Sequence, residues 1–567
     1  MGGEAIDAYR AACAQLQIGP DRDANLAKCL AAVDRAAAEG ARLVALPELC
    51  NLPGPFPSRE AAWAAAEPLP GTFHDALVER AARHGLYLAF NILVRGAAPD
   101  TFITTFLADP AGRALACYAK QVLFARQADW CRPGDLPLPV VDTPLGRIGL
   151  YVCMDGLIPE STRVLAVLGA QVLINPLNTA GPDEPDLHVP ARAAEARAWM
   201  LAPNKVGPLA DAHAARYAGG SAIAAPDGTL VARASEDAEE IVYATIEPAR
   251  ADDKMLPGGD DLLRDRRPAT YSLLTAPRDQ VPAYQQPAAS ERPVGLAAVQ
   301  CSARGPADRA VLDRALALAE RAVAAGARVL VLPEAFLWAA GEVAADPAAA
   351  AERSRAAVER FAALCARRGA YAALNVVEAA NGARHNTLAL LGPRGLVGRY
   401  RQTHVRAADR VWATPGDDYP VFDTEVGRLG LMLGYDGLFP EVARILALQG
   451  AEAILYPCAW RVPYEPRLLV VERAAENHVA LVAACRPDAP VPEGSRILPL
   501  TRYPCEPHWK IRYPQAVALA PGVEDILLAA VDLGAAAVKL IAHRTDLVAD
   551  RRPEYYDVLA AVPAPVG

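Results

Sequence analysis

Cys153 lies in one of two closely similar stretches of this chain of 567 residues. Thr143–Glu160 reads TPLGRIGLYVCMDGLIPE and Thr424–Glu441 reads TEVGRLGLMLGYDGLFPE, with ten of eighteen positions identical. Where the first stretch has Cys153, the second has Gly434. A thiolate can attack an electrophilic carbon atom, and glycine has no side chain that could do so. These residues predict covalent catalysis in the first half of the chain and its loss in the second.

Two charged residues of the first half could assist a reactive cysteine. Glu48 follows a short apolar segment, and a carboxylate there can accept the thiol proton and later activate water. Lys120 ends another segment, and its ammonium could stabilise a tetrahedral oxyanion. The second half keeps the carboxylate as Glu334 and has Gln402 in place of the lysine. The joint loss of lysine and cysteine predicts one active site per chain.

Each of the three residues also has a purely structural explanation when it is considered alone. Free cysteine is among the most buried residue types, so Cys153 could fill a small space at a strand end. Glu48 could be a solvated charge, and Lys120 could be an exposed residue of an edge strand. Their joint position favours a site, because open α/β sheets gather catalytic groups at the carboxyl ends of their strands.

Strands and helices are expected to alternate along the first half. Helices are predicted where apolar residues recur at helical spacing between Pro and Gly boundaries, at 21–39, 73–84 and 159–168. Strands are predicted for short apolar or alternating segments, at 42–46, 86–94, 101–107, 114–120, 147–152 and 171–175. The pattern favours a mixed sheet carrying helices, in the α/β (α+β) class.

Further matches show that the duplication extends along the whole chain. GARLVALPE, which ends at Glu48, corresponds to GARVLVLPE, which ends at Glu334, and the ending DRRPATY corresponds to DRRPEYY. A proline-rich polar seam lies between the two copies. We therefore expect a catalytic domain over 1–280, a linker over 281–293 and a degenerate, non-catalytic domain over 294–567.

Composition restricts the class of protein. The net charge is −9 and no Lys/Arg run exceeds a pair, which argues against a nucleic-acid partner. No stretch approaches the ~18 apolar residues of a membrane span, and the N-terminal residues have no signal-peptide pattern, so we expect a cytoplasmic protein without a membrane partner. The eleven cysteines have neither disulfide-framework nor zinc-ligand spacing.

Taken together, the motifs resemble the nitrilase, or carbon–nitrogen hydrolase, superfamily. They are LPE around Glu48, YAK around Lys120 and a Gly-x-x-x-Cys-x-Asp pattern around Cys153, with DRRP endings in both copies. The resemblance implies two tandem four-layer α-β-β-α sandwiches and a mechanism without cofactor or metal. It also implies that Cys153 attacks a carbonyl carbon with Glu48 as the base, while Lys120 and the backbone N–H of Met154 hold the oxyanion.

Two positions depart from this family's usual pattern. A second glutamate is common seven residues before the Pro-Gly glycine, and here that position holds Gln127. In the aliphatic-amidase branch the glutamate lies two residues later, where this chain has Asp129 as a possible substitute. The string CMDG around Cys153 resembles amidases and formamidases more than nitrile hydrolases, so a small amide is the expected substrate.

Several alternatives remain open from the sequence. An N-carbamoyl compound or a nitrile could replace the amide, and an amine could intercept the thioester in place of water. A non-catalytic binding protein is the alternative from a different class. The second copy is expected to form an intramolecular pseudo-dimer with the first, because family domains commonly pair, and further homo-oligomers are possible.

Overall fold

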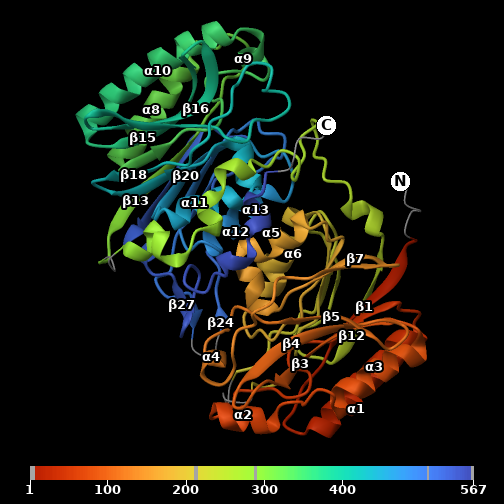
Figure 1. Ribbon diagram of the computed structural model, residues 1–567. Coiled ribbons are helices and arrows are strands. Elements are labelled where there is room, and N and C mark those ends of the chain that lie inside the picture. Colours follow the sequence, from red (N-terminus) through yellow and green to blue (C-terminus); the bar gives the residue numbers. More distant parts are fainter. Residues whose placement is uncertain (1–6, 210–214, 287–289, 507–509, 563–567) are drawn as a thin grey trace. The chain divides into compact units, whose positions relative to one another are not determined.

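The computed structural model describes residues 7–209, 215–286, 290–506 and 510–562, in which the chain forms two compact units. The N-terminal unit comprises residues 1–254 together with 503–513 and 540–559. The C-terminal unit comprises 255–502, 514–539 and 560–567. Within the described residues, each unit contains two six-stranded sheets (Figure 1). The expected α/β class and tandem arrangement are confirmed.

The first sheet of the N-terminal unit has the order β12-β1-β2-β3-β4-β5. Its strands are β1 (Tyr9–Gln15), β2 (Leu43–Ala45), β3 (Tyr87–Arg95), β4 (Thr101–Ala108), β5 (Ala114–Ala119) and β12 (Glu240–Ile246). Strand β2 runs parallel to β1 and β3, and the remaining pairs are antiparallel. Strand β2 is an inner strand with neighbours on both sides. The residues that follow β2 therefore lie near the middle of one edge of the sheet, away from its outer strands.

The second sheet of this unit has the order β11-β10-β9-β8-β7-β6. Its strands are β6 (Val140–Thr143), β7 (Gly146–Leu150), β8 (Val172–Ile174), β9 (Trp199–Ala202), β10 (Ala222–Ala224) and β11 (Leu230–Arg233). Strands β7, β8 and β9 are parallel, as expected when helices connect them. Their carboxyl ends therefore meet at one edge of the sheet.

Helices cover the outer faces of both sheets. Helices α1 (Arg22–Ala38) and α3 (Thr72–His84) lie along the first sheet, and α5 (Pro159–Val167) and α6 (Val189–Ala196) accompany the second (Figure 1). The apolar face of α1, including Cys29 and Val33, packs in one cluster with strand residues such as Leu88. Each unit is thus built in α-β-β-α layers, and the helices and strands predicted for the first half all form.

The C-terminal unit repeats this plan. One sheet contains β13 (Pro293–Gln300), β14 (Val329–Val331), β15 (Tyr371–Ala380), β16 (Ala383–Gly392), β17 (Gly395–Arg401) and β26 (Asp525–Asp532). The other contains β18 (Val421–Thr424), β19 (Gly427–Leu431), β20 (Ala453–Cys458), β21 (Ala480–Cys485), β22 (Arg496–Leu498) and β25 (Val517–Ala518). Its main helices are α8 (Val311–Ala324), α10 (Pro347–Arg368), α11 (Pro440–Leu448) and α12 (Val470–Ala475).

Shorter elements join these layers. The remaining helices are α2 (Arg59–Ala65), α4 (Gln127–Trp130), α7 (Ser272–Thr275), α9 (Glu342–Ala345) and α13 (Asp557–Ala560). Two small hairpins, β23 (Cys505–Glu506) with β24 (Lys510–Ile511) and β27 (Leu540–Ala542) with β28 (Thr545–Asp546), belong to the N-terminal unit. Across the part of the chain that the structure describes, no helix is long and apolar enough to cross a membrane.

The end of each copy belongs to the unit of the other copy. The DRRP segment of the first copy lies in the C-terminal unit, where Arg266 Nε donates to Glu441 Oε1 over 2.8 Å. The DRRP segment of the second copy lies in the N-terminal unit, where Arg551 Nε donates to Glu160 Oε1 over 2.7 Å. Each compact unit is therefore discontinuous along the chain, and the boundaries near residues 280 and 294 stay predictions about the repeats.

Candidate active site

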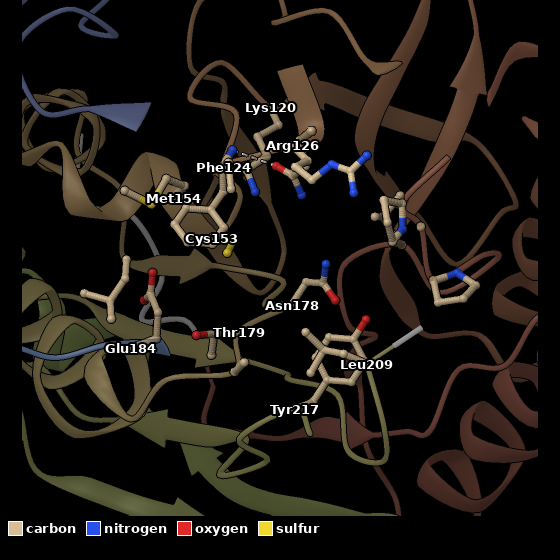
Figure 2. A pocket seen from close by; sticks show the side chains of 18 of the residues that line it. Lys120, Phe124, Arg126, Cys153, Met154, Asn178, Thr179, Glu184, Leu209 and Tyr217 are labelled. Atoms are coloured by element: carbon tan, nitrogen blue, oxygen red, sulfur yellow. Dashed lines mark hydrogen bonds between the residues drawn. The ribbon is translucent and has the colours of Figure 1, made fainter. Parts of the chain in front are cut away.

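A cavity of about 90 Å³ in the N-terminal unit contains Cys153, Lys120, Met154 and Gln127 on its lining (Figure 2). Figure 2 shows the Cys153 sulfur directed into the space between Phe124 and Asn178. Most of the wall is apolar, and a cavity of this volume holds only a few water-sized groups. Of the sequence-predicted residues, Cys153, Lys120 and Met154 thus line one cavity.

The backbone at Cys153 presents the thiol at the start of a short 3-10 helix, η1 (Cys153–Leu157), directly after β7. Its φ of 47° lies in the left-handed region, which is uncommon for a residue with a side chain and clusters at functional sites. Asn175, after β8, accepts the Cys153 backbone N–H. The buried Asp155 carboxylate accepts the backbone N–H of Val152 (3.1 Å) and Val122 (2.7 Å), so the turn is fixed from both sides.

Glu48 and Lys120 form an ion pair whose two side chains are fully buried. Lys120 Nζ donates to Glu48 Oε1 over 2.9 Å. Glu48 Oε2 has no hydrogen-bond partner among the described residues. A buried carboxylate oxygen without a hydrogen-bond partner lowers the stability of the fold. The presence of such an oxygen on Glu48 therefore points to a catalytic role, such as accepting a proton.

Gln127 completes the surroundings of the glutamate. It is the first residue of α4, and its Nε2 donates to the same Glu48 Oε1 over 3.2 Å. Its own Oε1 accepts the Phe124 backbone N–H over 2.8 Å. The residue found where relatives often carry a second glutamate therefore contacts the first one, as an uncharged donor.

Burial and charge act on the titratable groups in opposite directions. Burial raises the pKa of the Cys153 thiol well above its usual range, although the positive charge of Lys120 opposes this shift. Burial alone lowers the pKa of Lys120, but the nearby Cys153 and Glu48 more than reverse it, so the pKa of Lys120 lies above its ordinary value. Burial also raises the pKa of Asp155 to about 6. The surroundings therefore favour the protonated forms of both the Cys153 thiol and the Lys120 amine.

The two other candidate residues, Met154 and Asp129, differ in whether they line the cavity. Met154 lines the cavity as the residue after the cysteine. Asp129 is half-exposed on α4, and its carboxylate pairs with Arg126 (3.6 Å) and with Arg544. Within the described residues, the cavity lining includes Gln127 and does not include Asp129.

Three residues that the sequence did not single out contribute to the site. Asn175 ends a predicted strand, and a polar residue at that place was the available signal. Lys205 is fully buried behind the site, where burial lowers its pKa to about 8, and its ammonium lies 5.3 Å from the ring centre of Tyr217, which lines the cavity. Ile511 reaches the cavity wall from the hairpin β23–β24, and nothing in the sequence connects so distant a residue with Cys153.

The corresponding place in the C-terminal unit has lost this arrangement. Gly434 opens a 3-10 helix, η7 (Gly434–Leu438), with the same left-handed conformation as Cys153, at a φ of 51°. A Cβ atom on Gly434 would lie 2.5 Å from Glu334 Oε1. Gln402 donates from Nε2 to the Leu433 carbonyl over 2.9 Å. The backbone turn is retained, and the glutamate occupies space that a cysteine would need.

Comparisons with known proteins agree with this duplication. The family model described as carbon–nitrogen hydrolase matches residues 10–254 and again residues 295–497. A protein named nitrilase from Pyrococcus abyssi is 30% identical over 266 residues, which cover 46% of this chain and 98% of that protein. Human omega-amidase NIT2 is 30% identical over 258 residues, covering 43% of this chain and 90% of that protein.

Among solved structures, an amidase from Nesterenkonia sp. is similar to this chain with a TM-score of 0.39 and 28% sequence identity. The match covers 46% of this chain and 93% of that one. Within the described residues, no group of three or more His, Cys, Asp or Glu side chains is placed to hold a metal ion.

Proposed function

This chain belongs to the carbon–nitrogen hydrolase family, and on that premise we propose that its N-terminal unit hydrolyses a small primary amide through a thioester on Cys153. The observation that carries the proposal is that Cys153, in its left-handed turn, and Lys120 line one cavity, and that Lys120 forms a buried ion pair with Glu48. The match to human omega-amidase NIT2 supports an amide substrate. The cavity volume of about 90 Å³ favours a short acyl group.

The first half of the proposed reaction forms the thioester. Cys153 Sγ attacks the amide carbon while its proton moves to Glu48, because the neutral thiol needs a base. The Lys120 ammonium and the backbone N–H of Met154 stabilise the negative charge that develops on oxygen. When the carbon–nitrogen bond breaks, Glu48 returns the proton to the leaving nitrogen, so ammonia departs and an acyl-enzyme remains.

The second half releases the acid. Glu48 removes a proton from water, and the resulting hydroxide attacks the thioester carbon. The same two donors stabilise the second tetrahedral intermediate, and Cys153 leaves with the proton that Glu48 held. Gln127 and Lys120 keep the Glu48 carboxylate in place throughout, since both donate to its Oε1. The reaction consumes one amide and one water and yields one acid and one ammonia.

Replacement of the nucleophile tests this assignment. In Cys153→Ala, we expect ammonia release from propionamide or butyramide to fall by about a thousandfold or more, while the circular dichroism spectrum is unchanged. Cys117→Ala is the matched control, because Cys117 is an exposed free thiol. Full turnover in the Cys153 variant would show that the proposal is wrong.

The substrate class requires a separate comparison. Butyramide, butyronitrile and N-carbamoyl-β-alanine are offered to the unsubstituted chain, with and without added hydroxylamine. We expect ammonia from the amide, and an acyl-enzyme that is detectable by intact mass and diverted to a hydroxamate by hydroxylamine. Faster turnover of the nitrile or the carbamoyl compound would reassign the substrate while leaving the nucleophile unchanged.

A further inference from the structure

The C-terminal unit retains a cavity at the place that corresponds to the active site. Its volume is about 340 Å³, against about 90 Å³ for the cavity around Cys153. Glu334 lines this cavity, whereas in the other unit Glu48 contacts Lys120, which is on the cavity lining. The position of the nucleophile is glycine here. A site that had merely decayed would be expected to collapse or fill, because protein interiors are close-packed.

The Glu334 carboxylate has lost the partners that hold Glu48. Gln402 stands in place of the lysine, and its amide is engaged by Leu433 (2.9 Å) and by Asn386 (2.8 Å). Asp409 stands in place of Gln127 and accepts from Trp412 Nε1 over 3.0 Å. Glu334 is 5% exposed, and its Oε2 has no hydrogen-bond partner in the described part of the chain. The lysine that accompanies Glu48 is therefore replaced by a neutral amide at Glu334, whose negative charge acts instead on Arg406.

A positive charge has been added to the same cavity. Arg406 stands where the first copy has Phe124, and its side chain is 7% exposed. Its Nη1 donates to Asp260 Oδ2 over 2.8 Å, and the guanidinium lies 4.7 Å from the ring centre of Tyr435. These contacts fix the group, yet its buried Nε has no hydrogen-bond partner among the described residues. Arg406 thus offers a rigid, charged donor on the cavity wall.

Two tryptophans form further parts of the wall. Trp338 is buried, and its Nε1 has no hydrogen-bond partner within the described residues. Trp412 is partly buried and also lines the cavity. Aromatic walls with a few convergent polar groups are typical of small-molecule sites. Among the described residues, the lining atoms without a hydrogen-bond partner thus include the Glu334 Oε2 acceptor, the Arg406 Nε donor and the Trp338 Nε1 donor.

We propose that this cavity binds a free α-amino acid, with its ammonium group at Glu334 and its carboxylate at Arg406 and the indole N–H of Trp338. The ammonium takes the place that Lys120 occupies beside Glu48. The carboxylate takes charge-assisted hydrogen bonds from Arg406, and the amino acid's side chain contacts the tryptophans. Binding is non-covalent, because Gly434 supplies no nucleophile.

Arg486 and Asp488, which also line the cavity, pair with each other over 2.8 Å. The Glu334 carboxylate and the Arg406 guanidinium then determine what the cavity rejects. An amine without a carboxylate leaves the Arg406 Nε–H without a hydrogen-bond acceptor. An acid without an ammonium group brings a second negative charge close to Glu334. Both defects carry a penalty, because buried charges and donors without partners are costly. A zwitterion is therefore favoured over either singly charged analogue.

The test is calorimetric titration of the full chain in the Cys153→Ala background, so that turnover cannot contribute heat. Each of the common protein amino acids is titrated, followed by the decarboxylated and deaminated analogues of the best binder. At least one amino acid is expected to bind with a Kd below about 1 mM, and both analogues at least about tenfold more weakly. Absence of any binding at 10 mM, or equal affinity for an analogue, would overturn the proposal.

Variants then locate the site. Glu334→Gln and Arg406→Phe, the second of which restores the residue of the first copy, should each weaken binding by about tenfold or more. Glu48→Gln is the matched control in the other unit and should leave the affinity unchanged. Thermal unfolding checks that each variant folds. If a variant does not fold, the affinities of the analogues for the chain with an unsubstituted C-terminal cavity test the proposal instead. Loss of binding in Glu48→Gln alone would place the amino acid in the N-terminal cavity and refute the proposal.

Discussion

The protonation state of Cys153 determines which chemical role its neighbours have in the reaction. Burial raises the thiol pKa, and the positive charge of Lys120, followed by a hydrogen bond from the Asn178 backbone, offsets part of that shift. A neutral thiol at neutral pH cannot attack until a base takes its proton. Glu48, with one oxygen held by Lys120 and Gln127 and the other unpartnered among the described residues, is positioned for that transfer.

The raised thiol pKa makes a prediction about alkylation. Because the thiolate is the reactive form and the pKa of Cys153 lies above the ordinary value near 9, the rate of Cys153 carboxamidomethylation should still be rising with pH above pH 9. Lys120→Gln, the residue found in the second copy, should raise the thiol pKa further and slow labelling at pH 8. Intact mass and peptide mapping over a pH series measure both effects.

Cys117 provides the internal comparison for that experiment. It is exposed, so it should be alkylated faster than Cys153 at pH 8 in the same sample. A Cys153 labelling rate that is already at its plateau at pH 7 would contradict this prediction, since it would require a thiolate that burial disfavours.

Gln127 makes a second prediction at the scale of single residues. In Gln127→Glu, a second carboxylate would replace the amide that lies 3.2 Å from Glu48 Oε1. Two adjacent carboxylates raise the pKa of one of them, so the acidic limb of kcat/KM should move to higher pH by about one unit. Gln127→Met, which removes the donor without adding charge, is the control. An unshifted acidic limb in the glutamate variant would mean that Glu48 does not govern it.

At the scale of elements, the turn after the strand is common to both copies, and the glutamate is what distinguishes them. Cys153 and Gly434 share the left-handed conformation at the start of η1 and η7. In the C-terminal unit, however, the Glu334 carboxylate lies where a side chain on residue 434 would begin. In the C-terminal unit the glutamate therefore occupies the space that a side chain at residue 434 would need.

This packing predicts an unequal cost for two glycine substitutions. Gly434→Ala should lower the free energy of unfolding by about 2 kcal/mol, because the new Cβ displaces the carboxylate in addition to straining the backbone. Gly369→Ala should cost about 1 kcal/mol, because Gly369 shares the left-handed φ, at 65°, but has no neighbour within 4 Å. Urea unfolding measures both. In a Glu334→Ala background the difference should disappear, and a difference that persists would assign the cost to the backbone alone.

At the scale of the whole molecule, each unit is completed by sequence from the other copy. The N-terminal unit takes Ile511 into its cavity wall, Thr545 as a partner of the Ala125 backbone N–H (2.7 Å) and Arg551 as a buried partner of Glu160. Removing one partner of a buried ion pair commonly costs about 3–5 kcal/mol, since the other charge stays buried. The first copy alone therefore lacks parts of its own site and core.

That composition predicts the behaviour of separated halves. A fragment of residues 1–286 should be insoluble or inactive, whereas its co-expression with residues 287–567 should restore amide hydrolysis. The measurement is amide hydrolysis by the co-purified fragments. In the matched control, the second fragment carries Arg551→Met, which removes the buried partner of Glu160. A soluble and fully active first fragment would show that segments 503–513 and 540–559 are dispensable.

Much of this protein followed from the sequence because it depends on local rules. Periodicity and Gly or Pro boundaries placed the helices and strands of the first half within a few residues, and the repeat revealed two units of one family. Residue types alone pointed to Cys153, Glu48 and Lys120, since a thiol, a carboxylate and an ammonium at strand ends have few joint uses. The boundaries near 280 and 294 remain predictions about the repeats.

Only the tertiary structure decided what lies beside those residues. It places Gln127, and not Asp129, against Glu48, because α4 turns one side chain inward and leaves the other half-exposed beside Arg126. It brings Ile511 to the cavity and exchanges the ends of the copies, because packing depends on distance in space and not along the chain. It also shows Glu334 and Arg406 on the wall of one cavity, a juxtaposition that two separate positions in a sequence cannot reveal.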